Sequence, residues 1–159
     1  MPSKIVTRTA WWQAPLLADT WRRTLYILLA VPVGLAALVL ALVGRAAAAA
    51  RLQLRLADRL LEPRLDGDTA VGRPIRHALA SLPLNLAALV VTGYLWVGVP
   101  MNLLYPLRPG SESSDWGGPS LAGRWAVHAL GGLAMLYAVC WAVRGLTRLQ
   151  ARLVRRYLG

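Results

Sequence analysis

The strongest constraint on the fold is a set of three stretches without a single Asp, Glu, Lys or Arg. They cover residues 24–44, 77–107 and 125–143. A transmembrane helix needs about 20 consecutive, mostly apolar residues, so each stretch is long enough to cross a bilayer. Hydrophobic residues make up 57% of the 159 residues and charged residues only 16%, which is more apolar surface than one soluble core can bury. The sequence therefore predicts an all-α integral membrane protein.

The ends of these stretches refine the prediction. The first is too long for the core of a cleavable signal peptide, and Arg45 follows it without a convincing cleavage site. The second is longer than one span and contains Pro83 and Pro100, so we expect its membrane part at residues 84–99. Most of the seven tryptophans stand at stretch edges, which is typical of interfacial aromatic belts. Residues 1–20 are accordingly expected to form an N-terminal interfacial segment.

The segments between the stretches are of two kinds. Residues 45–76 are basic, and leucines and arginines recur there every four residues, which predicts a basic amphipathic surface helix ended by Pro63 and Gly67. Residues 144–159 predict a second such helix. Residues 108–124 are polar and rich in Gly, Ser and Pro, which predicts a loop. The expected architecture is about three membrane segments plus two basic amphipathic surface helices.

Two sequence motifs occur twice in the same order. PVGLAALV at residues 32–39 returns as PLNLAALV at 83–90, with six of eight positions identical. RLQLRL at 51–56 returns as RLQARL at 148–153. Coincidence in a chain rich in Leu, Ala and Arg is the simpler alternative, but the shared order favours an internal repeat. The second half is longer between its two motifs, and the extra residues hold the polar loop and the third span.

Basic side chains outnumber acidic ones 18 to 7, for a net charge of +11. A net positive charge of this size is typical of proteins that bind nucleic acid or an anionic membrane surface. The high apolar content favours the lipid bilayer and its anionic head groups as the partner, not nucleic acid. With three full spans and a cytoplasmic C-terminus, twelve basic residues are cytoplasmic and six external. A re-entrant first segment turning at residues 32–34 gives sixteen and two. Both counts predict a multi-pass protein of the cell membrane with an external loop at 108–124; the side of the N-terminus stays open.

Five longer stretches carry a resemblance to a known family. They are TWRRTLYILLAVPVGL (20–35), SLPLNL (81–86), LYPL (104–107), WGGPSLAGRWAVHALGG (116–132) and RGLTRLQARLVRRYLG (144–159). In these the chain resembles the sensor domain at the N-terminus of many actinobacterial two-component histidine kinases, which also occurs as a stand-alone membrane protein. The resemblance implies four membrane segments in two hairpins, whereas the first half of this chain has room for only one full span.

The chain offers little for catalysis or for cofactors. It contains no P-loop, and its membrane segments leave no room for a phosphoacceptor helix and an ATP-binding domain. We therefore predict no catalytic residue, no cofactor and no enzyme activity. The two histidines, His77 and His128, with Cys140 have no metal-ligand spacing, so no metal site is predicted. His77, beside Arg76, is expected at the membrane interface.

The polar loop and the start of the third span hold the candidate signal-sensing residues: Trp116, Gly117, Gly118, Pro119, Trp125 and His128. The Gly-Gly-Pro run predicts a tight turn that aims Trp125 and His128 at the outer interface. An ionisable residue inside a span is a functional candidate, although a histidine that only bonds to a helix end is the plainer alternative. The candidate relay and membrane-surface residues are the C-terminal arginines Arg144, Arg148, Arg152, Arg155 and Arg156.

These observations favour a non-catalytic membrane sensor that relays a signal to a cytoplasmic histidine kinase or regulator in two-component signalling, with a homo-oligomer as a further candidate partner. Two alternatives stay open: the N-terminal remnant of a truncated sensor histidine kinase, and a small membrane transport subunit. The near absence of ionisable residues within the predicted spans disfavours transport, because a substrate or ion pathway usually needs them.

Overall fold

The computed structural model describes residues 11–61, 73–108 and 116–158, and every regular element in that part of the chain is helical. Its four α-helices are α1 (Ala18–Leu42), α2 (Ala46–Leu61), α3 (Arg73–Leu103) and α4 (Leu121–Leu158), with short 3-10 helices at Trp11–Leu16 (η1) and Tyr105–Leu107 (η2). The all-α prediction is confirmed. Helices α1, α3 and α4 are long and apolar enough to cross a membrane, as the charge-free stretches predicted.

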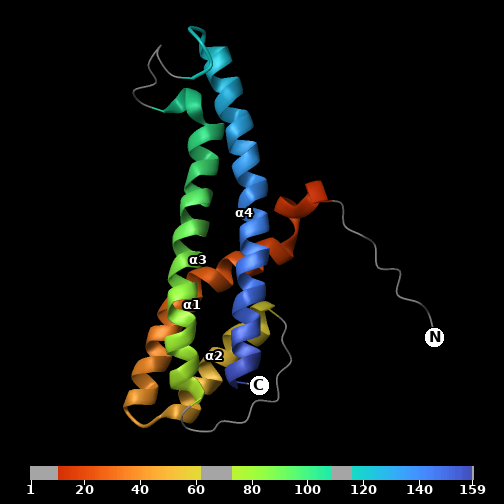
Figure 1. The fold of residues 1–159 in the computed structure, drawn as a ribbon. Coiled ribbons are helices and arrows are strands. Elements are labelled where there is room, and N and C mark those ends of the chain that lie inside the picture. Colours follow the sequence, from red (N-terminus) through yellow and green to blue (C-terminus); the bar gives the residue numbers. More distant parts are fainter. Residues whose placement is uncertain (1–10, 62–72, 109–115, 159) are drawn as a thin grey trace, which may run out of the picture.

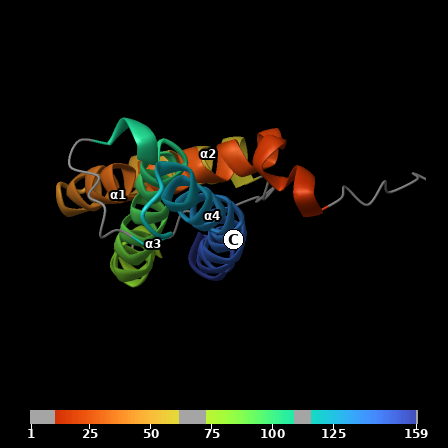
Figure 2. The same ribbon diagram turned by 90° about the horizontal axis from the view of Figure 1, so that it is seen from above.

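The helices form two antiparallel hairpins of unequal length. Helices α3 and α4 run side by side over most of their lengths, and α1 crosses them obliquely from mid-height to the base (Figure 1). Helix α2 turns back along α1, so that the base of the molecule contains four helices (Figures 1 and 2). The upper parts of α3 and α4 project beyond the α1–α2 hairpin as a two-helix arm.

A glycine turn joins α1 to α2. Gly44 has a φ of +81°, a left-handed conformation that favours glycine. The Gly44 N–H donates to the carbonyl of Ala41 and the Arg45 N–H to that of Leu40, which is the Schellman arrangement at a helix C-terminus. Alanines then form the first turns of α2, and the buried ones let α2 lie close to α1. Only three residues therefore separate α1 from α2 in the short hairpin.

Internal prolines do not break the long helices. Helix α1 runs unbroken through Pro32, so the alternative of a re-entrant turn at residues 32–34 is wrong. Helix α3 likewise includes Pro83 and Pro100 and extends beyond the expected membrane part at 84–99 in both directions. Neighbouring helices and small adjustments can satisfy the carbonyls that a proline leaves free, which makes interior prolines more tolerable in membrane helices than in soluble ones.

Both basic segments are helical, as predicted, but neither is an isolated surface helix. The second is the continuation of α4, which passes from the third apolar stretch into the arginine-rich end without a break. Its buried residues recur every three or four positions and face the bundle: Val143, Thr147, Gln150, Val154 and Leu158. Helix α2 likewise buries one face and exposes its arginines. The predicted helix end at Pro63 and Gly67 lies outside the described residues.

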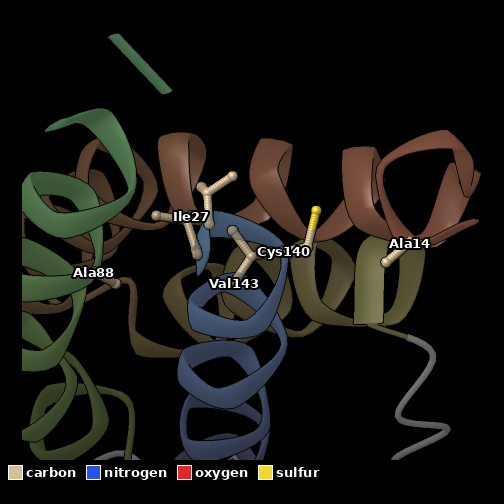
Figure 3. Packing of buried hydrophobic residues seen from close by; sticks show 6 residues of the cluster. Ala14, Ile27, Ala88, Cys140 and Val143 are labelled. Atoms are coloured by element: carbon tan, nitrogen blue, oxygen red, sulfur yellow. The ribbon is translucent and has the colours of Figure 1, made fainter. Parts of the chain in front are cut away.

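The packing core lies where α1 crosses the long hairpin. Ile27 of α1 is fully buried beside Val143 and Cys140 of α4, with Ala88 of α3 completing the contact (Figure 3). Ring stacking between Trp21 of α1 and Trp96 of α3, with centroids 4.7 Å apart, flanks this core. The first turns of α1 are thereby fixed at the middle of α3 and α4.

Small residues bring α3 and α4 together in the arm. A Cβ atom on Gly98 would lie 2.7 Å from the sulfur of Met135, and one on Gly132 would lie 3.0 Å from the side chain of Leu103. Glycines at such positions allow membrane helices to approach closely.

The internal repeat corresponds to the two hairpins. PVGLAALV lies in α1 and PLNLAALV in α3, while RLQLRL lies in α2 and RLQARL in the end of α4. The four-helix base therefore contains both copies, one in each hairpin. The residues that lengthen the second half form the arm, as their place between the two motifs predicts (Figure 1).

Candidate functional site

The turn that leads into α4 is tightly folded at the tip of the arm. Gly117 and Gly118 have φ values of +117° and +85°. A Cβ atom on Gly117 would lie 2.5 Å from the Cα of Arg124, so no other residue fits there without a shift of the backbone. The hydroxyl of Ser120 accepts a bond from the Gly123 N–H at 3.1 Å, which caps the start of α4. The turn predicted from the Gly-Gly-Pro run is therefore present, but α4 already begins at Leu121, inside the segment 108–124 expected to be a loop.

Arg124 fixes this turn to the helix. Its side chain is buried, and Nη1 donates to the carbonyls of Gly118 at 3.3 Å and Pro119 at 2.8 Å. Its Nε is buried without a partner among the described residues. A guanidinium donates five N–H groups in a fixed plane, so it can hold two backbone carbonyls and still present a donor to another acceptor.

An aromatic contact joins the two helices just below the turn. The rings of His128 on α4 and Tyr105 in η2 stack with centroids 4.0 Å apart, and Tyr105 is fully buried. His128 Nδ1 lies 2.9 Å from the carbonyl of Arg124, so that nitrogen carries the proton, since a carbonyl can only accept. The indole N–H of Trp125 donates to the carbonyl of Leu103 at 2.9 Å.

The structure thus gathers five of the six predicted sensing residues into one cluster, which we call the tip cluster. It contains Gly117, Gly118, Pro119, Trp125 and His128 together with Tyr105 and Arg124. Trp116 adjoins the turn, and its side chain is 84% exposed. The prediction missed Tyr105 and Arg124, although both belong to the stretches that carried the family resemblance.

A second polar site lies at the base, between the hairpins. His77 Nδ1 of α3 bonds to Gln53 Oε1 of α2, and both side chains are buried. The amide of Gln150 on α4 donates to Asn85 Oδ1 at 2.9 Å, and the Asn85 amide lies 3.5 Å from the Ala30 carbonyl of α1. We call these four side chains the base network, which contacts all four helices.

The base network retains unused bonding capacity. Gln53 Nε2, His77 Nε2 and Gln150 Oε1 are buried and have no partner among the described residues. A cavity of about 10 Å³ lies among Gln53, His77, Asn85 and neighbouring side chains, which is close to the space one water needs. His77, expected at the membrane interface, is 5% exposed and packed between helices, so its side chain faces other helices and not lipid head groups.

The internal repeat in the sequence indicates two members of the base network. Gln53 and Gln150 occupy the same position in the two copies of the RLQ motif, and both are buried against α3. The three residues considered as a metal set do not come together. His77 contacts Gln53, His128 contacts Arg124, and Cys140 packs in the apolar core.

The C-terminal arginines occupy the outer face of α4. Arg148, Arg152, Arg155 and Arg156 are exposed, and Arg144 is half-buried. Arg156 also lies over the ring of Tyr157, with 5.8 Å between the guanidinium carbon and the ring centroid. On α2, Arg51, Arg55 and Arg59 are exposed. The base of the molecule is therefore strongly basic on two of its helices.

Comparison with known families identifies the family of the chain. The model of the family described as "Putative sensor" matches residues 55–158. The chain belongs to this family. The sensor-family match covers α3 and α4 completely, and therefore both the tip cluster and most of the base network, whereas α1 and the start of α2 precede it. No curated protein and no solved structure matches the chain.

Proposed function

We propose that this chain is a multi-pass, non-catalytic sensor module that receives a signal at the tip cluster and relays it to a cytoplasmic partner of the two-component type. The observation that carries the proposal is the continuity of α4. One unbroken helix, Leu121–Leu158, contains His128 near its start and the relay arginines at its end. A displacement at the tip would therefore pass along a single helix to the arginines. Membership of the sensor family supports the same role.

The charge distribution supports the orientation of this module. The described base carries the exposed arginines of α2 and α4, while the described part of the tip carries only Arg108 and the buried Arg124. Cytoplasmic segments are enriched in Arg and Lys, so the base belongs on the cytoplasmic side and the tip outside. A signal from outside the cell would then meet the tip cluster first.

We infer that the contacts at the tip can open, so that a signal would select between a closed and an open arrangement. The Tyr105–His128 stack and the Trp125–Leu103 hydrogen bond hold the start of α4 against α3. A ligand that binds His128 or Arg124 better when this stack is open shifts α4 relative to α3. Such a shift requires different affinities for the two arrangements, since a ligand that binds both equally moves nothing. At the base, the Asn85–Gln150 bond would register the movement.

Variants that separate signal reception at the tip from partner binding at the base test the proposal. The full chain is captured by affinity from its own membrane, and its partners are identified. We expect a histidine kinase or response regulator, which Arg155→Glu/Arg156→Glu releases and His128→Ala retains. In a reporter assay of that partner's pathway, His128→Ala and Trp125→Ala should change output. Trp141→Ala is the matched control, because Trp141 is exposed on α4 between tip and base.

Two results would contradict the proposed function. One is the capture of no two-component protein by the wild-type chain. The other is an equal output from His128→Ala and Trp141→Ala at equal abundance in the membrane, since the tip cluster would then have no special part in signalling.

A further inference from the structure

An open apolar groove of about 580 Å³ runs between α3 and α4 where the third apolar stretch meets the basic end of α4. Its α3 side is formed by Ala87 and Val91, and its α4 side includes Ala142, Gly145 and Leu149. The small residues leave the groove open, and a Cβ atom on Gly145 would meet nothing within 4 Å. The volume of this groove lies within the range of ligand sites, and its mostly apolar lining suits an acyl chain.

Two arginines border the groove. Arg148 and Arg152 line it, and they are one helical turn apart, so their guanidinium groups lie on the same face of α4. Among the described residues neither forms a hydrogen bond or an ion pair, and the described ion pair that the chain does form, Asp19–Arg23, lies on α1. Their charge is therefore available to an outside anion.

The position of the arginines matches the depth of lipid head groups. The charge-free stretch of α4 ends at Val143, and Arg148 follows five residues later, about 7.5 Å along a helix that rises 1.5 Å per residue. If residues 125–143 span the hydrocarbon core, the guanidinium groups lie at head-group level while the groove extends back toward the acyl chains. A free anion would use the arginines alone and leave the apolar part of the groove empty.

We propose that this groove is a binding site for an anionic phospholipid, with an acyl chain between α3 and α4 and its phosphate at Arg148 and Arg152. The lipid occupies a defined site, in contrast to the diffuse attraction that any basic helix exerts on an anionic leaflet. It also bridges α3 to the arginine-rich half of α4. The site does not depend on the relay role of α4, so either proposal can fail without the other.

Lipid retention by the purified full chain tests this proposal. The chain is extracted in detergent from vesicles of phosphatidylglycerol and phosphatidylcholine, and bound lipid is counted by native mass spectrometry. We expect phosphatidylglycerol to be retained over phosphatidylcholine. Arg148→Gln/Arg152→Gln should weaken retention about twenty-fivefold, since each basic side chain contributes about fivefold at an anionic surface. Arg155→Gln/Arg156→Gln removes the same charge from the same helix outside the groove and should have little effect.

A second pair of variants tests the apolar part. Gly145→Leu fills the groove without changing charge and should lower retention of phosphatidylglycerol, whereas Gly93→Leu should not. Gly93 is the matched control, because a Cβ atom there also meets nothing within 4 Å and it does not line the groove. Equal losses from the two arginine pairs would overturn the proposal in favour of diffuse surface charge. Full retention by Gly145→Leu, or displacement of the lipid by inorganic phosphate at equal concentration, would show that the groove holds no acyl chain.

Discussion

At the scale of single residues, glycines and one arginine determine the tip. Gly117 has both a positive φ and a Cβ position blocked by backbone, whereas Gly118 has the positive φ and open space around it. Arg124 then bonds across the turn to two carbonyls. The turn is thus specified by one steric requirement and one buried charge, and the family stretch beginning at Trp116 encodes both.

Alanine at each glycine should separate these effects. A left-handed conformation costs a residue with a Cβ about 1–2 kcal/mol, so Gly118→Ala should lower thermal stability modestly. Gly117→Ala adds a collision with the backbone of Arg124 and should lower it more. Gly145→Ala, in an open helical position, should be neutral or stabilising by about 1 kcal/mol. Thermal unfolding of the full chain in detergent, followed by tryptophan fluorescence, gives the order; equal midpoints for the first two variants would contradict this account of the tip.

At the scale of elements, side-chain amides connect the two hairpins. Asn85 is the central member, because it accepts from Gln150 of α4 and lies within bonding distance of the Ala30 carbonyl of α1. Gln53 and His77 form the second connection, between α2 and α3. Few water molecules compete for these groups in a buried site, so removing one partner leaves the other unsatisfied.

A double-mutant cycle tests the Asn85–Gln150 connection. Asn85→Leu and Gln150→Leu should each lower the free energy of unfolding by about 1–3 kcal/mol, because each leaves a buried amide without its partner. The double variant should lose less than the sum of the two, since both polar groups are then absent. Unfolding in mixed micelles with increasing SDS measures the free energy of unfolding of the wild type, the two single variants and the double variant. Strictly additive losses would mean that the two amides do not interact.

Sequence reasoning identified elements better than their contacts. The spans follow from the absence of charge, and the repeat follows from motif order, so both are readable along the chain. The burial of His77 could not be predicted in this way, because its neighbour in sequence is Arg76 while its partner Gln53 lies 24 residues away. Pro83 and Pro100 were expected to limit α3, because proline interrupts helices in water; packing against α4 keeps this helix continuous.

At the scale of the whole molecule, the long hairpin of α3 and α4, whose helices are long and apolar enough to cross a membrane, has a second, shorter hairpin packed on its base. The outward faces of α3 and α4 expose many large apolar side chains, among them Val90, Val97, Leu130 and Trp141. A soluble protein rarely exposes contiguous apolar surface of this extent, whereas lipid covers it without cost. The arm brings the tip cluster to one end, and the basic base occupies the other.

The same organisation predicts the absence of kinase chemistry. The sequence contains no nucleotide-binding motif, and the described residues are helices that pack on one another. The purified chain should therefore show no saturable binding of ATP at micromolar concentration and no autophosphorylation with radiolabelled ATP. A partner kinase in the same assay is the positive control. Saturable ATP binding by the chain alone would contradict a non-catalytic role.

Cysteine labelling in intact cells tests whether the tip and the base lie on opposite sides of the membrane. Cys140 is fully buried and is replaced by alanine, leaving single cysteines at Trp116→Cys, on the exposed turn, or Arg156→Cys, on the exposed end of α4. A membrane-impermeant maleimide should label Trp116→Cys from outside and label Arg156→Cys only after the membrane is permeabilised. Labelling of Arg156→Cys in intact cells, with Trp116→Cys protected, would show the opposite orientation and overturn the proposal that the tip cluster lies outside.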